Sequence, residues 1–291
     1  MTHPASAITH LEIGSSTRLA YRKTGAGPDV VLVHGWPLHG ETFRAIVPRL
    51  QPHFTCHVID LPGTGESEWT ESTPITLRAH AAAVLRAIEA LGLSRVAFVA
   101  HDSGGAIARL AAAELGARCF GLVLGNTEIP GYRPPALAAF VRLARLPGGT
   151  RLLPLVLRSR WLRRSALGFG GCFHDRRVID GEFSTLFVEP LLASARAAAG
   201  QLALLRQFDW SVLDELAATH ARITAPVSLL WGADDPWFPL ARARGMVDQF
   251  PGGAELVELP RGKLFIHEER PDEWAEHARR FLERAAGRAE A

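Results

Sequence analysis

Short apolar runs typical of strands alternate with helical patterns along the first 127 residues, and this alternation limits the possible folds most strongly. The runs DVVLVHG, TCHVIDL, RVAFVAHD and CFGLVLGNT are apolar almost throughout, like strands buried on both faces of a sheet. Three helical patterns separate them: HGETFRAIVPRL, TLRAHAAAVLRAIEALG and GGAIARLAAAELGAR. Because strand and helix repeat in this order, we predict an α/β fold with a mostly parallel sheet and right-handed crossovers. ITHLEIG and TRLAYRKTG, which come first, alternate as a hairpin does.

The strand pattern stops between residues 130 and 219. This segment is rich in Leu, Ala and Arg, and it carries several aromatic residues that suit an apolar interior: Phe140, Trp161, Phe169, Phe173, Phe183, Phe187 and Trp210. The α/β pattern then resumes with APVSLLWGADDPWFP, LARARGMVDQF, AELVELP and the closing helix RPDEWAEHARRFLERAA. We therefore expect one α/β core, residues 1–129 and 220–291, with a helical cap or lid inserted at residues 130–219.

Composition limits the partners and the compartment of the protein. The chain has 32 basic and 30 acidic residues, so no long-range field favours nucleic acid or an anionic membrane. Its one basic cluster, RSRWLRRS at 158–165, is either a solvated helix face or a docking site for an anionic substrate or carrier. The N-terminus lacks signal-peptide features, no run reaches about 18 apolar residues, and three unpaired cysteines suit a reducing compartment. We expect a cytoplasmic protein, a monomer or homodimer, with no nucleic-acid or membrane partner.

Cofactor motifs are missing from the sequence. No set of His, Cys or acidic residues has metal-ligand spacing, and HEER at 267–270 is not the H-E-x-x-H motif. GTGES at 63–67 lacks the lysine of a phosphate-binding loop, and nothing resembles a dinucleotide fingerprint. We expect chemistry without a metal or a cofactor.

The stretch VAFVAHDSGGAIAR, residues 96–109, joins a predicted strand directly to a helix. A reactive residue at such a sharp turn needs small residues two positions away on either side, because the turn crowds them. Ala100 and Gly104 flank Asp102 in this way, whereas Ser103 would be flanked by the bulky His101. The spacing therefore selects Asp102, although an aspartate there is also a good N-cap for the following helix.

Two other strand ends carry groups that could assist Asp102. In VLVHGWP, residues 31–37, the backbone N–H of Trp36 can form an oxyanion hole together with the N–H of Ser103. In LLWGADDPWFP, Asp235 can orient an imidazole, or it is simply a turn residue before Pro236. Parallel strands place their carboxyl ends at one edge, where ligands bind in open α/β sheets.

These motifs together resemble those of a known superfamily. AHDSGG, HGWP, DLPGTGES at 60–67, GADDPWFP and LPRGKLFIHEERPDEW occur in the order of the α/β-hydrolase superfamily, and with the helical lid they cover nearly the whole chain. The resemblance implies an α/β-hydrolase fold with a mostly parallel eight-stranded sheet flanked by helices. An aspartate at the elbow resembles the branch of haloalkane dehalogenases, fluoroacetate dehalogenases and epoxide hydrolases. In that branch the aspartate forms an alkyl ester, and a histidine-activated water hydrolyses it.

The chain departs from this pattern at the general base. Aligned without gaps, PRGKLFIHEERPDE places Leu264 where these families have their catalytic histidine. His267 lies three residues further on. Either a rearranged loop brings His267 inward as the base, or the base is lost, in which case His267 is a solvent-facing residue at a helix start.

Substrate signatures of the three enzyme groups are also incomplete. Ser103 and Ala106 replace the carboxylate-binding arginines of fluoroacetate dehalogenases, and Ser103 also replaces the halide-binding tryptophan of haloalkane dehalogenases, for which Trp36 is a partial substitute. Tyr132 is the one tyrosine placed to polarise an epoxide oxygen. Glu128 is either a spare acid, near where some dehalogenases keep theirs, or a hinge residue.

The leading hypothesis is an α/β-hydrolase-fold enzyme that attacks a small to medium apolar substrate. The expected reaction is an epoxide hydrolase-like or dehalogenase-like hydrolysis. Asp102 is the expected nucleophile, Asp235 orients the base, and His267 is that base if one is retained. Trp36 and Ser103 form the oxyanion hole, and the expected substrate-binding residues are Trp36, Tyr132, Trp237 and Leu264. Tyr132 favours epoxide opening over dehalogenation.

Three alternatives remain open. A non-hydrolytic lyase, isomerase or cyclase with Asp102 as acid or base is motivated by Leu264. A catalytically silent ligand-binding protein has the elbow and the oxyanion turn against it. An esterase with Ser103 as nucleophile conflicts with the spacing around the elbow.

Overall fold

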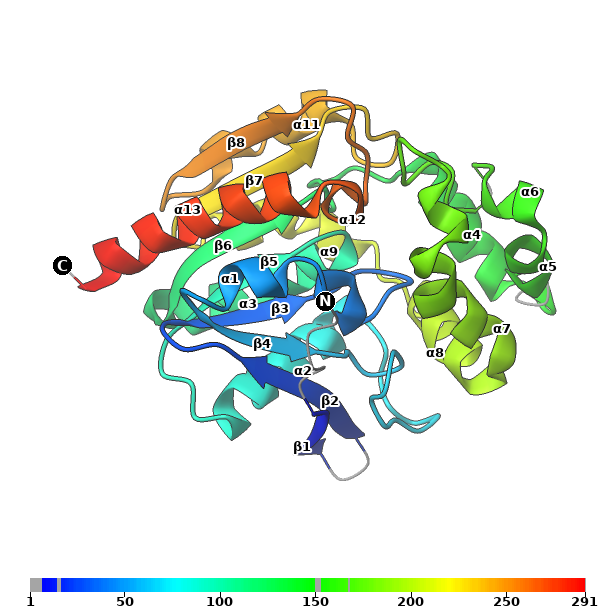
Figure 1. Ribbon diagram of the computed structural model, residues 1–291, viewed down its shortest axis with the longest axis horizontal. Helices are drawn as coiled ribbons and strands as arrows, with labels where there is room; N and C mark the ends of the chain where they lie inside the picture. Colours follow the sequence, from blue (N-terminus) through cyan, green and yellow to red (C-terminus); the bar gives the residue numbers. More distant parts are fainter. Residues whose placement is uncertain (1–6, 15–16, 150–152, 167, 291) are drawn as a thin grey trace.

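An eight-stranded sheet forms the centre of the computed structural model, which describes residues 7–14, 17–149, 153–166 and 168–290 (Figure 1). Its strand order is β1-β2-β4-β3-β5-β6-β7-β8. β1 and β2 form the expected antiparallel hairpin, β2 also pairs antiparallel with β4, and all other neighbours are parallel. The strands are β1 (Thr9–Gly14), β2 (Thr17–Thr24), β3 (Asp29–Val33), β4 (Thr55–Ile59), β5 (Val96–Ala100), β6 (Cys119–Gly125), β7 (Val227–Gly232) and β8 (Ala254–Leu259). The predicted α/β-hydrolase architecture is confirmed.

Helices cover both faces of this sheet because its strands are apolar on both sides. In β3, Val31 and Val33 belong to a core that includes residues of α2 (Leu77–Ala90) and α3 (Ser103–Leu115). Val30 and Leu32 face a second core formed with α13 (Pro271–Glu290) and α1 (Val47–Leu50). Because both faces of such a strand are buried, near-continuous apolar runs in the sequence correctly predict central strands.

Two predicted helices are shorter in the structure than their sequence patterns indicated. HGETFRAIVPRL forms only η1 (Gly40–Phe43) and the short α1, because Pro48 lacks the N–H that a continuous helix would need and instead sits in the first turn of α1. LARARGMVDQF forms α11 (Leu240–Arg244), which ends at Gly245, followed by η6 (Val247–Gln249). By contrast, α2 begins as expected, since the Thr76 side chain accepts the Ala79 N–H.

The described residues between β6 and β7 form helices and no strand. Figure 1 shows α4, α5, α6, α7 and α8 grouped beside the carboxyl ends of the strands. α10, however, packs on α3 of the core, so the proposed cap boundary at residue 219 remains a prediction. The elements are α4 (Pro135–Arg145), α5 (Leu153–Arg158), α6 (Arg160–Arg163), η4 (Val178–Asp180), η5 (Ser184–Val188), α7 (Glu189–Ala193), α8 (Ala195–Arg206), α9 (Ser211–Asp214) and α10 (Leu216–His220).

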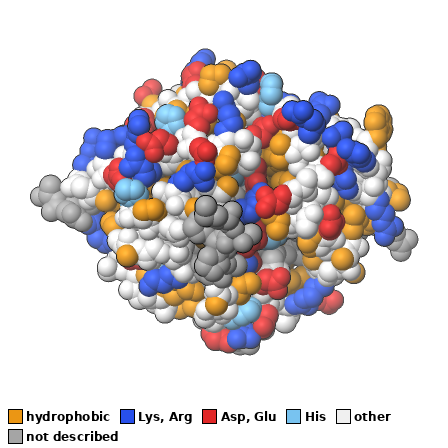
Figure 2. All heavy atoms as spheres, in the orientation of Figure 1, with side chains coloured by type: hydrophobic (Ala, Val, Ile, Leu, Met, Phe, Trp, Pro, Cys, Tyr) orange, Lys and Arg blue, Asp and Glu red, His pale blue; other side chains and the backbone are white. Residues whose placement is uncertain are grey.

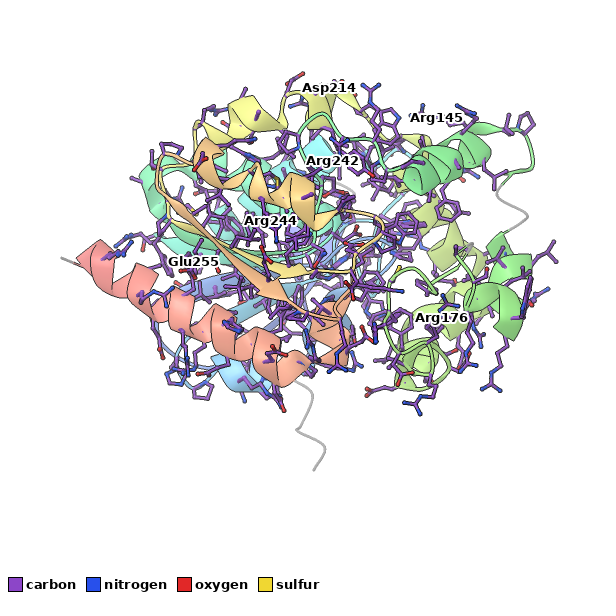
Figure 3. All side chains as sticks on the ribbon, turned by 90° about the horizontal axis from the view of Figure 1, so that it is seen from above. Arg145, Arg176, Asp214, Arg242, Arg244 and Glu255 are labelled. Carbon is purple, nitrogen blue, oxygen red and sulfur yellow. The ribbon has the colours of Figure 1, made fainter. Side chains whose placement is uncertain are left out.

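Charges of both signs are interspersed on the visible surface (Figure 2), as the balanced composition suggests. In Figure 3, Arg145 and Asp214 lie at the edge of the molecule. Within the basic cluster at 158–165, Arg160, Arg163 and Arg164 all pair with Asp180. In the described part of the chain, no helix is both long enough and apolar enough to cross a bilayer.

Two glycines at the start of α3 let this helix approach the sheet closely. A Cβ atom on Gly104 would lie 2.3 Å from the carbonyl oxygen of Val33 and 2.5 Å from that of His34. A Cβ atom on Gly105 would lie 2.3 Å from Oγ1 of Thr127. The turn after β5 therefore depends on glycine for space.

Gly104→Ala is expected to lower the free energy of unfolding by about 1–3 kcal/mol, because backbone carbonyls cannot move aside as a flexible side chain can. Urea unfolding followed by circular dichroism measures this change. Gly14→Ala is the control, since nothing lies within 4 Å of its added Cβ atom, and we expect a change below about 0.5 kcal/mol. Equal stability of the two variants would contradict the close-packing argument.

Candidate active site

Asp102 occupies the sharp turn between β5 and α3. Its backbone has φ 49 and ψ −140, and among the described non-glycine residues only Asp102 and Arg261 have positive φ. Such a conformation costs free energy, and it persists where the surrounding structure holds it in place. The side chain of Asp102 makes no capping hydrogen bond to α3, so the alternative interpretation as a simple N-cap is not what the structure shows.

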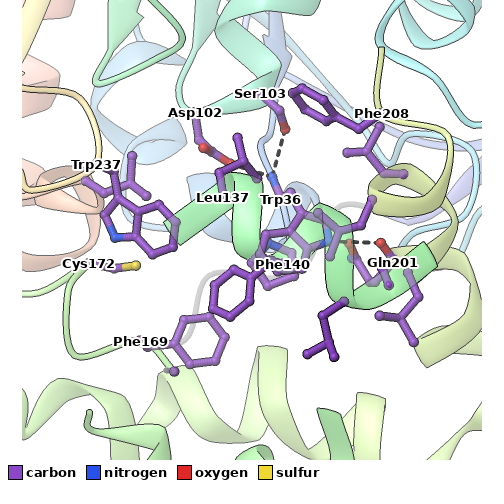
Figure 4. Close-up of a pocket in the computed structure, with 18 of the residues that line it drawn as sticks. Trp36, Asp102, Ser103, Leu137, Phe140, Phe169, Cys172, Gln201, Phe208 and Trp237 are labelled. Carbon is purple, nitrogen blue, oxygen red and sulfur yellow. Dashed lines mark hydrogen bonds between the residues drawn. The ribbon is translucent and has the colours of Figure 1, made fainter. Parts of the chain in front are cut away.

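The HGWP turn lies directly against the Asp102 carboxyl group. The Trp36 N–H donates to Oδ2 of Asp102 at 2.7 Å and lies 3.0 Å from Oγ of Ser103, as the dashed lines in Figure 4 show in part. A Cβ atom on Gly35 would lie 2.5 Å from that same Oδ2, so only glycine allows this approach. The Asp102 N–H donates to the Asn126 carbonyl at 2.7 Å, which fixes the turn from the other side.

A largely apolar cavity opens beside Asp102, between the strand ends and the inserted helices (Figure 4). Its empty space is about 1220 Å³, open solvent included. Among the described residues that line it, Asp102 and Glu128 are the only ones with carboxyl groups. The wall is otherwise dominated by leucines and by aromatic residues, which are Trp36, Phe140, Phe169, Phe208, Trp237, Phe238 and Phe265.

Three of the four predicted substrate-binding residues line this cavity: Trp36, Trp237 and Leu264. Tyr132 is not among the lining residues, because its ring packs under the guanidinium of Arg242, 4.5 Å from the ring centroid. The indole N–H of Trp36 donates to the Gln201 carbonyl at 2.9 Å, so it is not free to bind a halide. Tyr132 therefore lies outside the lining of the cavity, and the Trp36 indole N–H already has a partner within the protein.

Asp235 follows β7 and is buried, but it does not line the cavity. Its Oδ2 accepts from the Asn126 amide at 2.7 Å, and its Oδ1 accepts from the Trp237 N–H at 2.8 Å. Burial raises the pKa of Asp235 to about 7, against the opposing effect of these hydrogen bonds. Asn126 also links Asp235 to β7, because Oδ1 of Asn126 accepts the Gly232 N–H at 2.7 Å.

His267 lies away from the cavity, and this corrects both earlier interpretations of it. It is buried, with Nε2 2.8 Å from Oγ1 of Thr42 and its ring 4.0 Å from that of His101. Burial lowers the pKa of His267 to about 3, which disfavours a protonated ring. Because α12 (Ile266–Glu269) begins just before it, Leu264 and Phe265 face the cavity while His267 packs among other core residues. The structure thus shows neither an inward-swung base nor a solvent-facing residue.

Glu128 is the residue for which the sequence left two roles open, a spare acid or a hinge residue. It follows β6, is 1% exposed and lines the same cavity as Asp102. Burial raises the pKa of Glu128, while the charge of Arg109 opposes this. The only sequence signal was an acid placed just after a core strand, which fits a hinge residue equally well.

Electrostatics make Asp102 and Glu128 interdependent. Burial raises the pKa of Asp102 well above its ordinary value, and repulsion from Glu128 raises it further. The N–H groups of Ser103 and Trp36 act in the opposite direction by stabilising the carboxylate. Cys172, also in the cavity wall, is a free thiol whose pKa is raised by burial. Within the described ranges, no cluster of three or more His, Cys, Asp or Glu residues could hold a metal ion.

Comparison with known proteins places this arrangement in a family. The sequence profile of the alpha/beta hydrolase family matches residues 30–277. Haloalkane dehalogenase 2 of Mycobacterium tuberculosis is 30% identical over 262 residues, 89% of each chain. The pimeloyl-(acyl-carrier protein) methyl ester esterase of Pectobacterium atrosepticum is 27% identical over 276 residues, 91% of this chain and 98% of its own. The solved structure of epoxide hydrolase CorEH superposes with a TM-score of 0.77 at 23% identity, over 95% of this chain and 99% of that one. This chain belongs to the alpha/beta hydrolase family.

Proposed function

We propose that the Asp102 carboxylate attacks an electrophilic carbon of an apolar substrate and forms an alkyl ester, which water then hydrolyses. The observation that carries this proposal is the 2.7 Å hydrogen bond from the Trp36 N–H to Oδ2 of Asp102, at the wall of the cavity. With one oxygen held in this way, the other oxygen is the attacking atom. The same N–H groups, from Trp36 and Ser103, stabilise the negative charge that develops when water adds to the ester carbonyl.

The cavity wall supports a small to medium organic substrate with little polarity. Leucines and aromatic rings surround Asp102, and such walls bind by removing apolar surface from water. Epoxides and alkyl halides are the substrate classes that the names of the similar proteins suggest for an aspartate nucleophile. A halide ion would lack the Trp36 indole N–H, which is bonded to Gln201.

A second candidate is an isomerisation or elimination in which Asp102 acts as acid or base without forming an ester. Leu264 favours it, because an apolar side chain lines the cavity where these families have their catalytic histidine. The raised pKa of Asp102 increases the proton affinity of its carboxyl group, which suits a role in proton transfer. The two candidates differ in whether a covalent intermediate forms on Asp102.

Asp102→Asn is expected to abolish adduct formation and turnover, because an amide is a very poor nucleophile. Wild type and variant are incubated with a panel of terminal epoxides and primary alkyl bromides, and products and intact protein mass are measured. Ser103→Ala is the comparison variant, since only the backbone N–H of Ser103 has a role, and it should keep adduct formation within about tenfold. Adduct formation or turnover that survives in Asp102→Asn would contradict Asp102 as the nucleophile.

A homologous series of 1,2-epoxyalkanes tests the apolar cavity. Each added CH₂ group contributes about 0.8 kcal/mol on burial, so kcat/KM should rise about fourfold per carbon until the cavity is full. The same series with a terminal hydroxyl group is the control and should lose most of this gain. A kcat/KM that is flat with chain length would contradict an apolar substrate.

A further inference from the structure

Glu128 shares the cavity with Asp102 but has no part in the mechanism so far. Asp102 ends the turn after β5, and Glu128 follows the neighbouring strand β6, so the parallel pairing of these strands brings both carboxyl groups to one edge of the sheet. They are 8% and 1% exposed. Two buried carboxyl groups in one apolar cavity resist simultaneous ionisation.

Arg109 of α3 provides the positive charge beneath this pair. It is fully buried, and its guanidinium donates to the carbonyl oxygens of Gly105 and Glu128 at 2.9 and 2.8 Å and to Oγ1 of Thr127 at 2.9 Å. His220 of α10 lies 2.9 Å from Arg109 and is kept neutral, since burial and the Arg109 charge lower its pKa to about 3. A single buried cation balances one carboxylate, so ionisation of both carboxyl groups together is disfavoured.

The Thr127 hydroxyl group can form a hydrogen bond with Glu128 whether Glu128 is protonated or ionised. Its Oγ1 lies 2.8 Å from Oε2 of Glu128 and 2.7 Å from the carbonyl oxygen of Asp102. When Glu128 is ionised, the Thr127 hydroxyl donates to it. When Glu128 is protonated, Glu128 donates to Thr127, whose hydroxyl then turns to the Asp102 carbonyl. Both states of Glu128 therefore keep a hydrogen bond inside the protein.

We propose that Glu128 is the catalytic acid and base of this site, giving its proton to the oxygen of an opening epoxide and then taking one from the hydrolytic water. This inference rests on the proposed function, because it requires the ester on Asp102. It places a carboxyl group in the role left without an imidazole at Leu264. It also selects epoxides over alkyl halides, since a departing halide needs no proton and a departing alkoxide does.

The two half-reactions balance. In the first, an Asp102 oxygen bonds to an epoxide carbon, the carbon–oxygen bond of the ring breaks, and its electron pair on oxygen takes the proton of Glu128. In the second, water adds to the ester carbonyl as Glu128 takes one of its protons. The bond between the carbonyl carbon and the alkoxy oxygen then breaks, and the departing alkoxide takes the remaining proton of the water to become a hydroxyl group. Asp102 is again ionised and Glu128 again protonated.

Ester formation itself prepares Glu128 for the second step. The alkylated Asp102 is neutral, so the repulsion between the two carboxyl groups disappears and the pKa of Glu128 falls. Arg109 then has Glu128 as its nearby anion. Glu128 thus changes from acid to base without a conformational change.

Glu128→Gln separates the two roles with two probes, 1-bromohexane and 1,2-epoxyhexane. With the bromide, the Asp102 ester should form and then persist in the intact mass, because formation needs no acid but hydrolysis needs a base. With the epoxide, ester formation should slow by about 10²- to 10⁴-fold. Glu114→Gln, which removes an exposed carboxyl group on the same helix as Arg109, is the matched control and should behave as wild type.

The pH dependence of the alkylation rate distinguishes a catalytic role of Glu128 from a purely structural one. Bromide alkylation requires an ionised Asp102, whose pKa is raised by burial and by Glu128, with a smaller effect of Asp235. When Asp102 carries the proton of the pair, the ionised Glu128 raises the pKa of Asp102. Glu128→Gln removes this repulsion, so the pKa of Asp102 falls and the acid limb of the alkylation rate moves to lower pH. Arg109 and His220 are unchanged in both proteins.

Two further variants separate the loss of the carboxyl group from a loss of folding, which the melting curve of each variant measures. Glu128→Asp retains a carboxyl group and should hydrolyse the ester at least tenfold faster than Glu128→Gln. The double variant Glu128→Gln with Leu264→His offers an imidazole at the cavity wall, and it should release the trapped bromide adduct.

Distinct results overturn the two proposals. Absence of any Asp102-dependent adduct and turnover in wild type rejects the nucleophile and Glu128 with it. An Asp102 adduct that persists in wild type keeps the nucleophile but rejects Glu128 as base. Epoxide turnover by Glu128→Gln within about threefold of wild type rejects Glu128 alone, as does equal ester hydrolysis by the Asp and Gln variants.

Discussion

The close contact between the HGWP turn and the strand-to-helix turn at Asp102 is the constraint on which the site depends. The Trp36 N–H reaches the Asp102 carboxyl group only because Gly35 has no side chain, and α3 reaches the sheet only because Gly104 has none. These contacts hold Asp102 in its positive φ. A strained backbone and a preformed pair of N–H donors are thus two consequences of one packing arrangement.

Buried charge is the second organising element. The cavity offers Asp102 and Glu128 little solvent, and Arg109 lies beneath them with hydrogen bonds to neutral oxygens. In such surroundings the ionisation of one carboxyl group controls that of the other. The chemistry we propose uses this coupling directly, since neutralising Asp102 by ester formation changes the proton affinity of Glu128.

Periodicity and spacing predicted the fold and the position of the elbow well. Apolar runs such as that of β3 are buried on both faces, and the small residues around Asp102 follow from the crowding of a tight turn. The helical pattern before Leu50 wrongly predicted one continuous helix, because Pro48 cannot donate a backbone hydrogen bond within it. These features depend on neighbours in the sequence, which is why local patterns describe them.

The sequence by itself determined the sheet, the family motifs and the absence of a histidine at position 264. Only the tertiary structure decided where individual side chains point. Tyr132 turns to Arg242, His267 packs against His101, and Glu128 enters the cavity. Each of these outcomes depends on a partner far away in the chain or on the start of a helix, and the residue's own neighbours in the sequence do not specify it.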